Sequence, residues 1–237
     1  MIEISKSFKK RTWNPLLAPA VEGVLTYWPA ILFIQSIAVS VVLIYYFVDG
    51  TAGVFAAIAE WKLAGGLYFA AGTTVISGGI LPELIKRFFR PAGVAAPSTA
   101  ELCHQFIMWA TLGVLVDLFY RLQSTVFGEG TDALTLLVKV FVDQFVFAPL
   151  IALPFITLWF LLREVGYEPK KFLSCIRFKK IYNRVLPLWA TGLFFWPIML
   201  CMIFSLPTSL QFPLFLLGNA AYSILMIFIL RRQTESA

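Results

Sequence analysis

The chain has 237 residues, of which 59% are hydrophobic and only 14% are charged, and its mean hydropathy is +0.82. This composition excludes a water-soluble domain, because it leaves too little polar surface to cover a folded core. The net charge of +6 does not indicate nucleic-acid binding, since no stretch interleaves basic and aromatic residues, and we expect no nucleic-acid partner.

Runs of about 17 to 25 apolar residues, the length of a helix that crosses a bilayer, recur along the whole chain. Six such spans are predicted, at residues 24–48, 63–81, 103–120, 136–162, 187–206 and 212–230. The runs lack the alternation of barrel strands, and in lipid the backbone must pair within each segment, so the spans should be helices. The sequence therefore predicts an all-α polytopic transmembrane bundle that forms a single unit over residues 1–237.

Basic residues gather in the segments that would lie on one side of the membrane. All but three of the 19 Lys and Arg residues precede the first span, connect the second to the third or the fourth to the fifth, or follow the sixth. The three others are Lys62, Arg121 and Lys139. The positive-inside rule then predicts both termini on the cytoplasmic or matrix-equivalent side, where the basic residues meet anionic lipid headgroups.

The second predicted span carries a face of small side chains. Gly66, Ala70, Thr74 and Gly78 recur every four residues and so line one side of a helix. Such a face lets another helix approach closely in lipid. We interpret it as a helix-packing surface, and the wall of a pore is the alternative interpretation.

Charged and polar side chains gather near the non-cytoplasmic ends of the third and fourth predicted spans. Asp117 and Arg121 lie at the end of the third, and Lys139, Asp143 and Gln144 lie in the fourth. A carboxylate deep in the bilayer costs about 2.5 to 3.5 kcal/mol, so Asp143 should face the bundle interior and have a partner. Two acids and two bases are predicted to meet here, as a structural ion-pair network, as a site that selects or gates solutes, or as both.

Prolines interrupt the fourth and fifth predicted spans. Pro149 and Pro154 lack a backbone N–H, which in an α-helix would free the carbonyls of Phe145 and Leu150. Pro197 has the same effect at mid-depth in the fifth span. Broken helices in lipid persist where neighbours or water satisfy the freed groups, which is why they often line cavities.

No pattern indicates a catalytic or metal site. The single histidine, His104, and the three cysteines have no metal-ligand spacing. Asp117 and Asp143 lack the glycine-rich context of intramembrane aspartyl proteases, and no glycine loop is suited to phosphate. We therefore expect no enzyme, no cofactor and no metal.

Several short motifs carry a resemblance to a known family. The pattern comprises Val142-Asp143-Gln144, then Phe147-Ala148-Pro149, and later Trp196-Pro197 with Phe204 and Pro207. It resembles the Mpv-seventeen and peroxisomal-membrane-protein-twenty-two family over residues 63–230, with residues 1–62 as a tail and an additional span. Asp117 stands where that family has a histidine, and Leu200 and Ile203 replace polar residues of its C-terminal hairpin.

The resemblance implies a pore-like conduit for small solutes in a mitochondrial inner or peroxisomal membrane, or in the inner membrane of a bacterium. The leading hypothesis is a pore or facilitator with Asp143 as the polar element of its path. The alternative is a structural accessory subunit of a larger membrane complex, with protein partners and no transport of its own.

Overall fold

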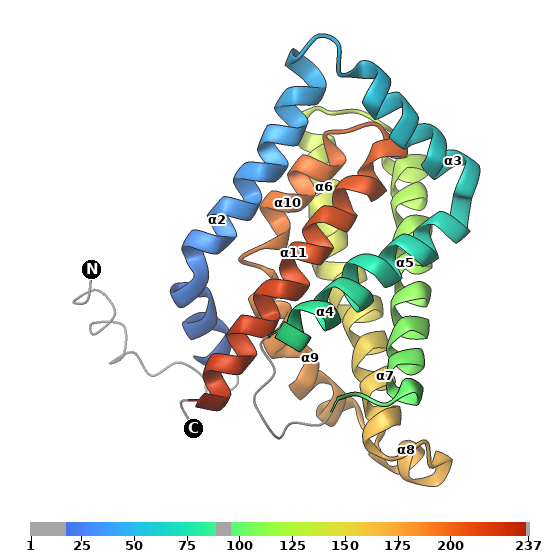
Figure 1. The fold of residues 1–237 in the computed structure, drawn as a ribbon, viewed down its shortest axis with the longest axis vertical. Helices are drawn as coiled ribbons and strands as arrows, with labels where there is room; N and C mark the ends of the chain where they lie inside the picture. The colour runs from blue at the N-terminus through green and yellow to red at the C-terminus, as the bar shows by residue number, and fades with distance from the viewer. Residues whose placement is uncertain (1–17, 89–95, 236–237) are drawn as a thin grey trace, which may run out of the picture.

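A computed structural model describes residues 18–88 and 96–235, and within these ranges the chain is helical throughout, with no strand (Figure 1). The prediction of an all-α fold is confirmed. The elements are α2 (Ala18–Phe47), α3 (Ala52–Thr74), η1 (Val75–Ile80), α4 (Leu81–Phe88), α5 (Thr99–Phe127), α6 (Ala133–Val142), η2 (Asp143–Ala152), α7 (Leu153–Glu164), α8 (Pro169–Cys175), α9 (Phe178–Gly192), α10 (Trp196–Phe204) and α11 (Thr208–Glu235), where η1 and η2 are π-helical.

The described helices make this chain an integral membrane protein. Four stretches are long and apolar enough to cross a bilayer: Val24–Phe47, Ala52–Phe88, Thr99–Phe127 and Ala133–Glu164. The pair α9 and α10, bent by 65°, forms a fifth if it is one broken span. The described residues thus carry four to five candidate spans, and the predicted sixth, which lies in α11, is not among them.

Large apolar side chains cover the outside of the bundle. Tyr68, Phe47 and Phe178 are 91%, 78% and 78% exposed, respectively. Such rings would be buried in a water-soluble protein of this size, and lipid is the solvent that suits them.

Local capping explains why two spans extend beyond the apolar runs. Ser98 and Glu101 form a reciprocal capping box that starts α5, and Asp132 accepts a hydrogen bond from the Thr135 backbone N–H at the start of α6. At the C-terminal end of α5, Gly128 adopts φ +79°, a conformation that side chains disfavour, and the helix ends there.

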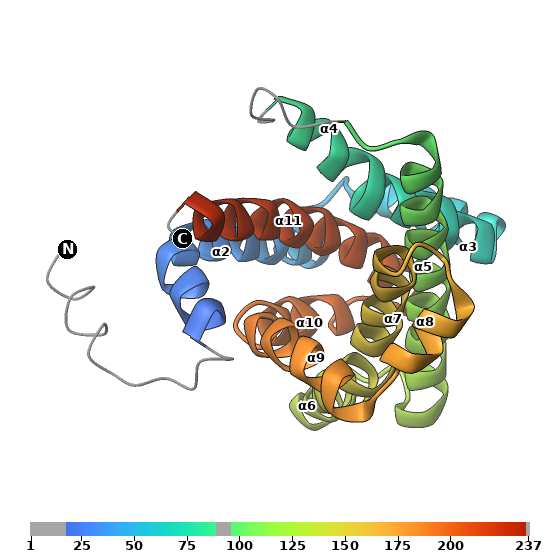
Figure 2. The ribbon, with the colours of Figure 1, turned by 90° about the horizontal axis from the view of Figure 1, so that it is seen from below.

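The helices pack as a bundle with a broken helix inside it. Figure 2 shows α2 beside α11, and the α9–α10 pair lies between these two and the α6–α7 helix, in agreement with the contacts. One core cluster joins α2, α3, α5, α10 and α11, and a smaller one joins α7 to α9. Both the start of α2 and the end of α11 lie at the same end of the bundle (Figure 1).

Part of the topology prediction lies outside the described residues. The basic residues before position 18, and Arg90, lie outside the described ranges. The side of the membrane on which the termini lie therefore stays a prediction.

Candidate functional site

The fourth span contains a ten-residue π-helix, η2, around Pro149. In a π-helix each N–H bonds the carbonyl five residues back, as Leu153 does to Ala148 at the end of η2. In this register the missing N–H of Pro149 frees the carbonyl of Gln144. The prediction of a freed carbonyl on Phe145 assumed α-helical spacing, so the π register moves it by one residue. Pro154 lies beyond η2, in the first turn of α7.

Side chains of α9 contact two carbonyls of η2, including the freed one of Gln144. The indole Nε1 of Trp189 donates to the Gln144 carbonyl oxygen across 2.7 Å, and the Tyr182 hydroxyl makes a longer contact of 3.5 Å with the Pro149 carbonyl oxygen. A polar backbone group in lipid needs such a partner. Trp189 thus stabilises a helix break in the preceding span.

The predicted fifth span is sharply bent between α9 and α10. Pro197 lies in the first turn of α10, which turns away from α9 by 65°. Gln35 of α2, a buried residue that sequence reasoning did not single out, donates from Nε2 to the Phe195 carbonyl oxygen at 3.1 Å. The first span is thus hydrogen-bonded to the broken helix within the core.

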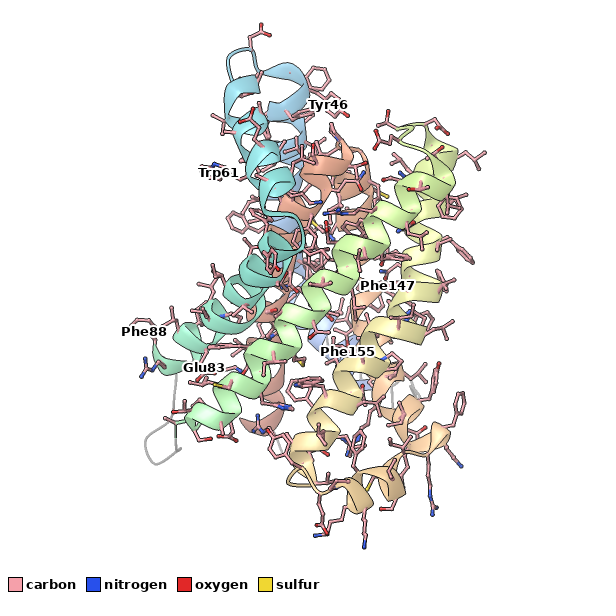
Figure 3. The ribbon with its side chains drawn as sticks, turned by 90° about the vertical axis from the view of Figure 1, so that its right-hand side faces the viewer. Tyr46, Trp61, Glu83, Phe88, Phe147 and Phe155 are labelled. Carbon is pink, nitrogen blue, oxygen red and sulfur yellow. The ribbon has the colours of Figure 1, made fainter. Side chains whose placement is uncertain are left out.

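A cavity of about 150 Å³ lies among α5, η2, α7, α9, α10 and α11. Its lining residues include one acid, Asp143, and two amides, Gln144 and Asn219. Seven aromatic side chains complete much of the wall: Trp109, Tyr120, Phe147, Trp189, Trp196, Phe215 and Tyr222. In Figure 3, Phe147 lies between its own helix and α5, where its ring stacks on Phe119 at 4.1 Å between centroids. The two breaks, at η2 and between α9 and α10, leave this space inside the bundle.

Asp143 is the acidic group of the cavity. Its side chain is 7% exposed and accepts a hydrogen bond from Gln144 Nε2 at 3.0 Å. Within the described part of the chain no Lys, Arg or His forms an ion pair with it. Asp143 therefore brings a carboxyl group to an apolar cavity with no basic partner.

The predicted cluster of two acids and two bases is divided in the structure. Asp117 Oδ1 pairs with Lys62 Nζ at 2.7 Å, and Asp117 Oδ2 pairs with Arg121 Nη2 at 2.7 Å. Lys139 is fully buried, but its ammonium lies 5.9 Å from the centroid of the Phe204 ring and has no hydrogen-bond partner in the described residues. Asp143 and Lys139 form no ion pair, although they are one turn apart.

Lys62 is the partner that sequence reasoning missed. It lies before the predicted second span because hydropathy alone places a lysine outside the membrane. In the structure the helix begins at Ala52, and the Lys62 side chain is 3% exposed because Asp117 neutralises it. One signal was available in the sequence: Lys62 is one of only three basic residues that fall outside the segments predicted on the cytoplasmic side.

The small-residue face of the second span has two different roles. Gly113 of α5 packs so closely on Ala70 and Thr74 that a Cβ atom would overlap both, and Gly78 lies directly under the ring of Trp109. Gly66 takes no part in this packing: it adopts φ +51°, breaks α3, and has open space where a Cβ would be. The small-residue face therefore packs closely against α5 from Ala70 onward, whereas Gly66 breaks the helix.

Two polar pairs hold further helices together. Asn219 of α11 donates from Nδ2 to the Ser77 hydroxyl at 3.1 Å, an interhelical hydrogen bond of the kind that stabilises helix pairs in lipid. His104 and Trp159 are paired twice: the Trp159 indole donates to the His104 carbonyl oxygen at 2.9 Å, and His104 Nε2 lies 3.1 Å from the Trp159 carbonyl oxygen. These two contacts between His104 and Trp159 connect α5 to α7.

Comparison of this chain with known family models, curated proteins and solved structures found no match.

Proposed function

We propose that this membrane protein is a pore or facilitator for small solutes and that the cavity at Asp143 is part of the path. The supporting observation is a carboxyl group, 7% exposed and with no basic partner in the described residues, that lines a cavity of about 150 Å³ inside an apolar bundle. A carboxyl group is costly in lipid, and such groups commonly mark solute or ion pathways. A purely structural acid would be expected to have a cation beside it, as Asp117 has.

The broken helices support the same proposal. Transporters commonly place their sites where discontinuous helices meet near the middle of the membrane. Here η2 and the α9–α10 break both border the cavity, and side chains of α9 bond two carbonyls of η2. A cavity that is bordered by two broken helices suits a small solute.

Flux through proteoliposomes tests the proposal. Purified full-length protein should pass glycerol or urea faster than protein-free liposomes do, and Asp143→Asn should change the ratio of charged to neutral solutes that pass. Liposomes that hold an unrelated helical membrane protein at equal density control for leakage. Equal flux with and without the protein would overturn the proposal, and a stoichiometric partner retained in mild detergent would then favour the accessory-subunit role.

We also propose the finer topology of six spans, with α11 as the sixth and both termini on the cytoplasmic or matrix-equivalent side. The basic residues on either side of the predicted spans support this orientation. Labelling of single cysteines placed at position 3 and position 236 with a membrane-impermeant reagent tests it. Both sites should react only after the membrane is opened when intact cells are labelled from outside.

The proposed family relationship and membrane rest on the sequence motifs. Asp143, Gln144, Phe147 and Pro149, which carry the strongest part of the resemblance, all lie in η2. A divergent member of the Mpv-seventeen and peroxisomal-membrane-protein-twenty-two family would reside in a mitochondrial inner or peroxisomal membrane, or in a bacterial inner membrane. Fractionation of the source cells tests this assignment.

A further inference from the structure

The cavity combines one carboxyl group with an aromatic wall, and among the residues that the structure describes no Lys, Arg or His lines it. Asp143 supplies the acid, and seven of the lining residues are Trp, Tyr or Phe. The faces of aromatic rings carry partial negative charge and attract cations within about 6 Å of the ring centroid. The acid and the wall therefore favour the same kind of occupant, one with positive charge.

The aromatic wall is held in place before any solute arrives. The indole of Trp189 is fixed by its hydrogen bond to the Gln144 carbonyl oxygen. The ring of Trp109 lies on Gly78, and that of Trp196 stacks on Phe215 with 5.9 Å between centroids. Binding to such a site avoids the entropic cost of ordering its side chains.

The lining suits an organic cation better than a metal ion. Ca²⁺ takes six to eight oxygen ligands and Mg²⁺ six in an octahedron. The lining has one carboxyl group, two amides and two tyrosines, and the described residues contain no group of three or more His, Cys, Asp or Glu side chains that would hold a metal. An ammonium group with apolar substituents needs only one counter-ion and contact with ring faces.

The volume suits a small occupant. A cavity of about 150 Å³ holds a molecule about as large as benzene, with roughly six heavy atoms. Tetramethylammonium and short primary amines are of this size or smaller.

We infer that this cavity binds a small organic ammonium ion, with Asp143 as its counter-ion and the rings of Trp109, Trp189 and Trp196 against its substituents. The inference rests on the proposed function, because it names the class of solute that the path would carry. The buried ammonium of Lys139 does not compete for Asp143, since it lies over Phe204 and outside the cavity lining.

Binding to the unaltered protein is the first test. Tetramethylammonium chloride should raise the melting temperature of the purified full-length protein, whereas sodium chloride at equal ionic strength and tert-butanol, a neutral molecule of similar shape, should not. This comparison does not depend on a variant that folds. Equal effects of all three compounds would overturn the inference.

Flux is the second test, with tetramethylammonium and glycerol measured in the same proteoliposomes. The ratio of tetramethylammonium to glycerol flux should fall on the order of tenfold in Asp143→Asn, the change that about 1.4 kcal/mol of lost ion pairing produces. The matched control is Glu164→Gln, which neutralises an exposed acid at the end of the same span, outside the cavity lining. An unchanged ratio in Asp143→Asn would overturn the inference.

The two solutes separate failure of the inference from failure of the proposed function. If glycerol passes faster than in protein-free liposomes and tetramethylammonium does not, the ammonium site is wrong and the facilitator role stands. If neither solute passes faster, both are wrong.

Discussion

The indole Nε1 of Trp189 lies 2.7 Å from the carbonyl oxygen of Gln144 and donates a hydrogen bond to it. Within the π-helix η2 this carbonyl would otherwise bond the N–H of residue 149, which is a proline. A side chain on α9 thus replaces a missing backbone donor in the preceding span, and the same contact positions the wall of the cavity.

Removal of the Trp189 donor should destabilise the bundle. Trp189→Phe keeps a ring but leaves the Gln144 carbonyl unpaired in an apolar surrounding, so we expect a loss of about 1 to 3 kcal/mol in the free energy of unfolding. Denaturant unfolding in detergent measures it. Trp61→Phe is the control, because that side chain is 69% exposed.

A second substitution identifies the cause of that loss. Pro149→Ala restores a backbone N–H near the Gln144 carbonyl, so Trp189→Phe should cost less in the Pro149→Ala background than in the unaltered protein. Equal costs in the two backgrounds would show that the hydrogen bond to Gln144 is not what Trp189 contributes.

The buried ion pairs of Asp117 should respond unequally to neutralisation. Asp117→Asn leaves the Lys62 ammonium buried without an anion, and we expect a loss of about 3 to 5 kcal/mol. Lys62→Met should cost less, because Asp117 keeps Arg121. Arg121→Gln should cost about 0 to 1 kcal/mol, since the Arg121 side chain is 44% exposed. Melting temperatures of the three variants in one detergent give the order, and a largest effect for Arg121→Gln would contradict this account.

Gly113 and Gly72 make a matched pair for the packing of α5 on α3. Gly113→Ala places a Cβ against the Ala70 backbone oxygen and the Thr74 side chain, so we expect about 1 to 3 kcal/mol of destabilisation. Gly72→Ala adds the same methyl group to α3 where no side chain or neighbouring helix lies within 4 Å, so it should cost nothing and should gain up to about 1 kcal/mol from helix propensity. Similar losses for both variants would mean that close approach of α5 to α3 is not the cause of the loss at Gly113.

Asp132, in the loop before α6, should add a pH-dependent contribution to stability. Hydrogen bonds from the Thr135 hydroxyl and from the Thr135 backbone N–H lower the pKa of Asp132. A carboxyl whose pKa is lowered by folding stabilises the protein above its ordinary pKa, and this contribution is lost as the pH falls through the lowered value. Asp132→Asn keeps a capping side chain without a titrating group.

The measurement compares unfolding midpoints of the unaltered protein and Asp132→Asn between pH 6 and pH 3. The difference between them should be constant near pH 6 and should shift against the unaltered protein as the pH approaches 3. A difference that does not vary with pH would contradict the assigned role of the Asp132 carboxylate.

Long-range pairing accounts for most of what sequence reasoning did not find. Asp117 and Arg121 are one helical turn apart, and their pairing follows from helix geometry. Lys62 is 55 positions from Asp117 in the chain, and only the packing of α3 on α5 brings the two side chains together. Likewise, Gln35 reaches Phe195, and Trp189 reaches Gln144, through the arrangement of helices rather than through any local pattern.

The sequence by itself determined the membrane environment, the helical class, and the positions at which the fourth and fifth spans break, because these follow from local hydropathy and from the missing N–H of proline. Tertiary structure alone decided that Asp143 lines a cavity, that Asp117 pairs with Lys62 as well as with Arg121, and that Lys139 lies over the ring of Phe204. The physical reason is that a charge buried in a low-dielectric bundle is stabilised by whichever groups the neighbouring helices bring within a few ångströms, and Lys62 and Phe204 are distant in sequence from the charges they contact.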